Sequence, residues 1–322
     1  MQAGEPAIAG TPAAAVAEPG FGDRLASLVA ERSSQVVLGL DPDPARLWPH
    51  ALELAGGAGG PPAERAARAV AAHCRLVLEA AGEHCVAVKP QVACFERLGA
   101  AGWGALRETV AAARELGLLV IADAKRGDID FSAKAYGQAF FGETPTPFGA
   151  VPGLGVDALT VNPLLGSDSL RPLVTIARER FGGLFVLVRT SNPGAADVQD
   201  LLLEGGMTVS DAIARMVTEL GSPGVGPAGL SDVGAVAGAT VPERLEALRD
   251  AMPHAVFLLP GVGAQGGRVE DLSPAFRPGP AGGLIAASRA IVYAHENGSG
   301  NAARAAGREA ARLRELAWGL RP

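Results

Sequence analysis

Eight short apolar runs recur along the 322-residue chain, and their spacing constrains the fold more than any other feature. They are residues 36–40, 86–88, 118–122, 158–161, 184–188, 233–237, 256–259 and 284–287. Between or before them, helices are predicted at residues 21–32, 62–81, 104–116, 169–181, 209–220 and 242–251. Alternating strands and helices predict an α/β fold with a parallel sheet, and runs without polar alternation indicate strands buried on both faces. Eight of them favour closure into a single-domain (β/α)8 barrel, a TIM barrel, over an open sheet.

The segments outside this pattern set the predicted domain boundaries. Residues 1–20 are mostly Ala, Pro and Gly, and we expect a disordered N-terminal tail before a barrel domain at 21–322. Residues 142–155 and 56–62 are predicted to be irregular loops rather than linkers to a second domain. The run at 233–237 carries the weakest strand signal, because it is rich in Gly and Ala.

Charge and composition exclude several classes of protein. The formal net charge of -6 argues against a nucleic-acid-binding surface, so an anionic ligand would need a local basic pocket. No window approaches the roughly 18 apolar residues of a membrane span, and the first residues lack the basic start of a signal peptide. The odd number of cysteines, without a CxxC motif, predicts buried thiols rather than disulfides or a metal site. These features favour a cytoplasmic protein.

Lysine is unusually scarce. Only Lys89, Lys125 and Lys134 occur among 28 basic residues, and the other 25 are arginines. An ammonium group can shift its pKa and deliver a proton, whereas a guanidinium group effectively cannot. Each lysine is therefore a candidate for chemistry that arginine could not perform.

Polar residues that bind or transfer charge follow the predicted strands. In a (β/α)8 barrel the active site lies at the carboxyl ends of the strands, where this chain has Asp41, Lys89, Asp123, Lys125, Asn162, Ser191, Gln265 and Arg289. Asp123 and Lys125 are two apart, so an extended chain points both to one face, and Asp128 follows in a loop containing Gly127. The alternative interpretation is an exposed loop with a surface salt bridge. It is less favoured, because the charged residues directly follow an apolar run. Alone, Lys89 could be a surface residue and Asp41 a turn cap.

A glycine-rich segment, residues 261–267, follows the seventh run. It matches GxGxxG, but it lies late in the chain, and the acids Glu270 and Asp271 come too soon after it for a dinucleotide-binding site. Simple tight turns are a second alternative. With Ser288 and Arg289 after the eighth run, the segment better fits the phosphate site that barrels build from their last two loops.

These motifs together resemble a known family. The chain is similar over residues 21–318 to orotidine 5'-phosphate decarboxylases, specifically the longer bacterial branch called type 2. The resemblance rests on eight segments in order: Phe21-Gly-Asp-Arg, Leu40-Asp-Pro, Val88-Lys-Pro-Gln, Asp123-Ala-Lys-Arg-Gly-Asp-Ile, Thr160-Val-Asn-Pro, Thr190-Ser-Asn-Pro-Gly, Pro260-Gly-Val-Gly-Ala-Gln and Ala287-Ser-Arg.

The resemblance implies a role for each candidate residue. It implies an array of alternating charges made of Lys89, Asp123, Lys125 and Asp128. It also implies a homodimer, in which the partner subunit supplies Asp128 together with Ile129 and Ser132. Substrate contacts are also implied: Asp41 and Lys89 to ribose hydroxyls, Ser191 to the pyrimidine, and Gln265, Ser288 and Arg289 to the 5'-phosphate. Two residues depart from the family pattern, namely Asp130, where a small residue is expected, and Ser132, where Thr is usual.

The implied reaction makes UMP and CO2 from orotidine 5'-phosphate in pyrimidine synthesis, without a metal or other cofactor. Lys125 would stabilise the carbanion at C6 and protonate it. One alternative is a Mg-dependent phosphosugar decarboxylase or aldolase on a related barrel. Those enzymes also contain Asp-x-Lys-x-x-Asp. The resemblance implies that they differ from this chain by carrying an acid at the position of Lys89. The other is a catalytically silent barrel that binds nucleotides or phosphosugars.

Overall fold

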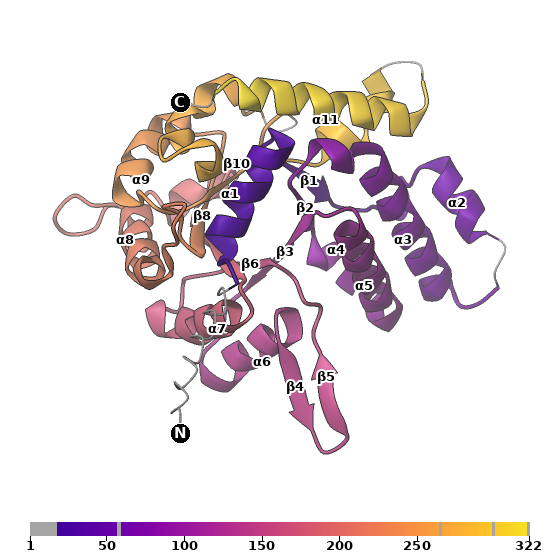
Figure 1. Ribbon diagram of the computed structural model, residues 1–322, viewed down its shortest axis with the longest axis horizontal. Helices are drawn as coiled ribbons and strands as arrows, with labels where there is room; N and C mark the ends of the chain where they lie inside the picture. Colours follow the sequence, from indigo (N-terminus) through magenta and orange to yellow (C-terminus); the bar gives the residue numbers. More distant parts are fainter. Residues whose placement is uncertain (1–17, 57–58, 264–265, 298–299, 321–322) are drawn as a thin grey trace, which may run out of the picture.

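Eight parallel strands form a closed barrel in the computed structural model, which describes residues 18–56, 59–263, 266–297 and 300–320 (Figure 1). Neighbouring strands around the barrel follow the order β1-β10-β9-β8-β7-β6-β3-β2. Their bounds are β1 (Val36–Leu40), β2 (Ala87–Pro90), β3 (Leu119–Arg126), β6 (Ala158–Val161), β7 (Gly183–Arg189), β8 (Val233–Ala237), β9 (Phe257–Pro260) and β10 (Gly283–Ala287). The predicted single-domain barrel is confirmed, including the weakest strand, β8.

Helices surround this barrel and connect its strands. The longer ones are α1 (Phe21–Arg32), α3 (Pro62–Ala81), α5 (Gly99–Glu115), α6 (Asp130–Phe140), α7 (Ser167–Glu179), α8 (Val209–Gly221) and α11 (Ala302–Trp318). Shorter ones are α2 (Pro49–Ala55), α4 (Val92–Glu96), α9 (Leu245–Ala251) and α10 (Arg289–Val292). Turns of 3-10 helix are η1 (Gly82–His84), η2 (Pro193–Asp197), η3 (Ser222–Gly224), η4 (Pro242–Arg244), η5 (Val269–Phe276), η6 (Pro280–Gly282) and η7 (Ala294–Asn297). None of the described helices is long and apolar enough to cross a membrane.

The helix α1 closes the amino end of the barrel (Figure 1). Its Phe21 packs edge-on against Phe185 inside the barrel, with ring centroids 5.8 Å apart, and Arg24 pairs with Asp157, the residue before β6. Apolar side chains therefore fill the barrel interior at the amino ends of the strands. The carboxyl ends of the strands stay available for polar groups, as barrel enzymes require.

Residues 142–155 are not the irregular loop expected from the sequence. They contain an antiparallel hairpin, β4 (Glu143–Thr146) and β5 (Gly149–Pro152), which projects beside α6 (Figure 1). The expectation was wrong because three prolines and a lack of alternating apolar residues hide the strand pattern. Residues 1–17 lie outside the described residues, so the predicted tail stays a prediction.

The side chain of Arg249 ties the amino ends of β9 and β10 together. It is buried and donates four hydrogen bonds of 2.7–2.9 Å to the carbonyl oxygens of Met252, Ala255, Ala275 and Gly282. Its guanidinium lies 3.7 Å from the ring centroid of Phe257, and burial lowers the pKa of Arg249 to about 9.

Replacing Arg249 by methionine is expected to lower the free energy of unfolding by roughly 3–5 kcal/mol, because four buried carbonyl groups lose their donor. Urea denaturation followed by circular dichroism measures this loss. The half-exposed Arg277, paired with Asp250 at 3.0 Å, is the matched control, and Arg277→Met should cost less than about 1 kcal/mol. Equal losses in the two variants would contradict the structural role of Arg249.

Candidate active site

A cavity of about 610 Å3 opens at the carboxyl ends of the barrel strands. Eight residues predicted from the sequence line it, namely Asp41, Lys89, Asp123, Lys125, Asn162, Ser191, Ser288 and Arg289. Apolar side chains of the barrel interior, including Leu187, Val236 and Leu258, form its floor. The cavity therefore combines an apolar base with charged walls, a combination typical of small-molecule sites.

Asp123 lies at the centre of the charged wall, between two lysines. Lys89 Nζ donates to Asp123 Oδ2 at 2.6 Å, and Lys125 Nζ donates to Oδ1 at 2.5 Å. Gln91 Nε2 lies 3.1 Å from Oδ2, and Thr160 Oγ1 lies 3.0 Å from Oδ1. Each carboxylate oxygen thus accepts two hydrogen bonds, which fixes Asp123 in one orientation.

The neighbouring charges keep Asp123 and Lys89 ionised. Burial opposes ionisation of Asp123, yet Lys89 and Lys125 outweigh it and lower the pKa of Asp123 to about 2. Burial likewise lowers the pKa of Lys89, but Asp123 and then Asp41 outweigh it, so the pKa lies above its usual value. Asp123 therefore stays charged until the pH falls to about 2, and Lys89 stays charged at neutral pH.

The backbone around Lys125 is not simply extended. Lys125 has a φ of 48°, a left-handed conformation that costs a non-glycine residue roughly 1 kcal/mol. The pairing of β3 with β6 shifts register between Ala122 and Arg126. Thr160 Oγ1 accepts the Lys125 backbone N–H at 3.0 Å and so stabilises this turn. Thr160 was missed as a site residue; the polar hydroxyl in a buried strand was the available signal.

Three residues of the Asp123 motif region lie apart from the cavity. Asp128, Ile129 and Ser132 are not among the residues that line it. Asp128 Oδ1 accepts the Ile129 backbone N–H at 2.8 Å, and the Ile129 side chain is half exposed. The unexpected acid Asp130 is exposed and has a φ of 44°. Within one chain, the array therefore has three of its four predicted members together.

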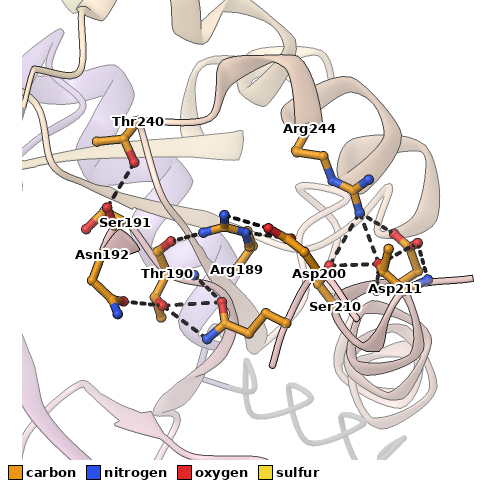
Figure 2. A network of polar contacts seen from close by, with 11 residues as sticks. Arg189, Thr190, Ser191, Asn192, Asp200, Ser210, Asp211, Thr240 and Arg244 are labelled. Atoms are coloured by element: carbon orange, nitrogen blue, oxygen red, sulfur yellow. Dashed lines mark hydrogen bonds and ion pairs between the residues drawn. The ribbon is translucent and has the colours of Figure 1, made fainter. Parts of the chain in front are cut away.

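The segment after β7 forms another wall of the cavity, and Figure 2 shows its polar contacts. Thr190, Asn192 and Gln199 line the cavity beside Ser191. Gln199 Oε1 accepts the Thr190 backbone N–H at 2.8 Å, and Thr190 Oγ1 donates to Asn192 Oδ1 at 2.7 Å. Sequence reasoning missed the role of Gln199, because the loop conformation that brings it back to Thr190 has no signature in the sequence.

The glycine-rich segment and the start of α10 form the remaining wall. Ser288 packs against Gly39, where a Cβ atom would lie 2.7 Å from Ser288 Cβ, so only glycine fits. The guanidinium-bearing side chain of Arg289 is exposed at the cavity. Gly261 and Gly263 have φ angles of 102° and 74°, so the backbone at these two residues adopts the conformation that favours glycine. Gln265 lies outside the described residues.

Fold and cavity define the class of protein: a (β/α)8-barrel enzyme with a charged small-molecule site at the carboxyl ends of its strands. The sequence model described as "Orotidine 5'-phosphate decarboxylase / HUMPS family" matches residues 34–305. The chain belongs to this family.

Individual relatives carry the same family name. The chain is 40% identical over 279 residues to an orotidine 5'-phosphate decarboxylase of Rhodopirellula baltica, covering 86% of this chain and 89% of the relative. It is 48% identical over 219 residues to that of Deinococcus radiodurans, covering 68% and 75%. The solved structure of the Leishmania donovani OMP decarboxylase superposes with a TM-score of 0.67 at 30% identity, covering 93% of this chain and 99% of that one.

Proposed function

We propose that this chain converts orotidine 5'-phosphate to UMP and CO2 without a metal or an organic cofactor. The observation that carries the proposal is the ionised Asp123 held between Lys89 and Lys125 in the main cavity. Decarboxylation at C6 leaves an electron pair with no conventional sink, so fixed positive charge is the stabilisation this reaction needs. Family membership and the names of the relatives support the same substrate.

Lys125 is the proposed acid. The C6–carboxylate bond breaks, CO2 leaves, and the electron pair stays on C6, where it takes a proton from the Lys125 ammonium. The Lys125 side chain is 47% exposed, so water can return the proton between turnovers. Asp123 and Lys89 are already fixed by hydrogen bonds, so little reorganisation accompanies the shift of charge.

We propose that the other walls of the cavity each bind a different part of the substrate. We assign the ribose hydroxyls to Asp41 and Lys89, and the pyrimidine to Ser191. The 5'-phosphate is assigned to Ser288 and Arg289, with Gln265 beside them. A phosphate held far from C6 lends its binding energy to the transition state, because the whole substrate is positioned at once.

We also propose a homodimer in which each chain contributes Asp128, Ile129 and Ser132 to the site of its partner. None of the three lines the cavity of its own chain, although all lie just beyond the strand that carries Lys125. Exposed apolar side chains nearby, Ile129 at 49% and Phe131 at 85%, fit burial against a second copy.

Magnesium-dependent phosphosugar chemistry fits this site less well. A divalent cation needs free carboxylate oxygens, whereas both oxygens of Asp123 accept hydrogen bonds from ammonium groups. A cation bound there would also meet the charges of Lys89 and Lys125. These contacts favour the metal-free reaction over the related one.

Product analysis tests the proposed function. The purified chain is incubated with orotidine 5'-phosphate, and separately with a 3-keto phosphosugar acid and Mg²⁺. We expect equal amounts of UMP and CO2 from the first and no turnover of the second. Turnover of the phosphosugar alone would replace this proposal with the magnesium-dependent one, and turnover of neither would favour a silent binding protein.

A further inference from the structure

The loop that carries Ser191 is anchored by an ion pair outside the cavity. This Ser191 loop, residues 190–200, follows directly after β7, whose last residue is Arg189. Arg189 Nε donates to Asp200 Oδ1 and Nη2 to Oδ2, both at 2.9 Å, while Nη1 donates to the carbonyl oxygen of Thr190 at 2.5 Å (Figure 2). One planar guanidinium therefore joins the first and last residues of the loop.

Arg189 has no access to a substrate in this arrangement. Its side chain is 8% exposed, and it is absent from the residues that line the cavity. By contrast Thr190, Ser191, Asn192 and Gln199, all between the two anchored ends, do line it. Arg189 can therefore act on a bound molecule only through the loop that it holds.

The segment that follows β8 contacts the other side of Ser191. A Cβ atom on Gly238 would lie 2.8 Å from Ser191 Cα, closer than real Cβ atoms come, so the two backbones are in tight contact. Thr240 Oγ1 donates to the Ser191 carbonyl oxygen at 3.1 Å, and Gly238 N–H donates to the carbonyl oxygen of Arg189 at 2.7 Å. Ser191 is thus held against the segment after β8 on one side, while the Arg189–Asp200 pair holds the two ends of its loop.

We propose that Arg189 is a positioning residue for recognition of the pyrimidine ring: its pair with Asp200 places Ser191 against the ring and leaves binding of the phosphate and ribose unaffected. The inference rests on the proposed function, because it assumes that Ser191 faces the base. Lysine cannot substitute for arginine in this role, since one ammonium cannot form the parallel pair of bonds that the guanidinium makes with Asp200.

Binding of two ligands distinguishes this positioning role from a general effect on the structure. UMP contains the ring, whereas ribose 5-phosphate has the same phosphate and sugar without it. By titration calorimetry on the full chain, Arg189→Lys is expected to weaken UMP binding about tenfold and to leave ribose 5-phosphate within about twofold of the unmodified protein. Equal weakening of both ligands, or unchanged UMP binding, would overturn the inference.

A matched control exists at the opposite end of the barrel. Arg178 forms a similar two-pronged pair with Asp232, the residue before β8. Arg178→Lys should change neither affinity, although it removes the same kind of fork. If Arg178→Lys weakens UMP selectively as well, the effect does not belong to the Ser191 loop and the inference fails.

A double-mutant comparison tests the route through Ser191. Adding Arg189→Lys to Ser191→Ala should weaken UMP binding no further, because the group that Arg189 positions is already gone. Independent, multiplying effects would contradict the inference. Should Arg189→Lys not fold, Asp200→Asn breaks the same ion pair from the other side with a side chain of equal size, and the same selective loss of UMP is expected.

Failure of the proposed function gives a different pattern. The unmodified protein could bind UMP no more tightly than ribose 5-phosphate, or Ser191→Ala could leave UMP binding unchanged. Either result would contradict the proposed contact between Ser191 and the ring, and the inference would fail with it. If Ser191→Ala weakens UMP while Arg189→Lys does not, the placement stands and only the role of Arg189 is lost.

Discussion

Lys125→Ala is expected to lower the turnover of orotidine 5'-phosphate at least about ten-thousand-fold while UMP still binds. The variant removes both the proton donor and the nearest positive charge to C6, and each is worth roughly a hundredfold or more. Asp123 would not be left unpaired, because Lys89, Gln91 and Thr160 still donate to it or lie within hydrogen-bonding distance. The folded site should therefore persist, and calorimetry with UMP would measure that persistence.

The chain offers a control for this substitution in its third lysine. Lys134 is exposed on α6 and does not line the cavity. Lys134→Ala removes the same charge from the protein and should leave turnover within about twofold, because exposed charges contribute little on their own. Near-normal turnover by Lys125→Ala would remove the proposed proton donor.

Mixing two inactive variants is expected to restore activity. Asp128→Asn alone should lose at least about a hundredfold in turnover, since it removes one charge from a preorganised array. In a mixed dimer with Lys125→Ala, one site keeps Lys125 and receives Asp128 from the other chain. If chains pair at random, half of the dimers are mixed and each has one complete site, so about a quarter of the original activity should return.

This complementation depends on which residues come from different chains. Asp123 and Lys125 both lie on β3 and contact each other within one chain, so Asp123→Asn mixed with Lys125→Ala should restore nothing. Co-expression of each pair of variants, followed by measurement of the ultraviolet absorbance of orotidine 5'-phosphate during turnover, tests both cases. Full activity of Asp128→Asn alone, or no recovery in the first mixture, would show that Asp128 is not shared between subunits.

The barrel could be predicted because its strands are buried on both faces. Runs such as Val36–Leu40 and Val233–Ala237 consist of apolar residues and glycine, and no alternating pattern competes with that signal. The β4–β5 hairpin could not be predicted in the same way. It is exposed along its length and contains proline, so hydrogen bonds rather than apolar burial define it.

Part of the site was likewise predictable, for a topological reason. Parallel strands bring their carboxyl ends together, so residues as distant in sequence as Asp41 and Arg289 meet at one cavity. The left-handed turn at Lys125 and the hydroxyl of Thr160 that supports it were not predictable, because both depend on the register between β3 and β6. The Arg189–Asp200 pair depends on how a loop folds back, which eleven residues of sequence do not reveal.

The central claim is that the lysine–aspartate array decarboxylates orotidine 5'-phosphate by itself. The most direct test is the ultraviolet absorbance of that substrate after the protein has been treated exhaustively with EDTA. We predict that the absorbance changes to that of UMP at a rate proportional to protein concentration, and that added Mg²⁺ does not alter the rate. A spectrum that stays constant in EDTA, or changes only after a divalent cation is restored, would contradict the claim.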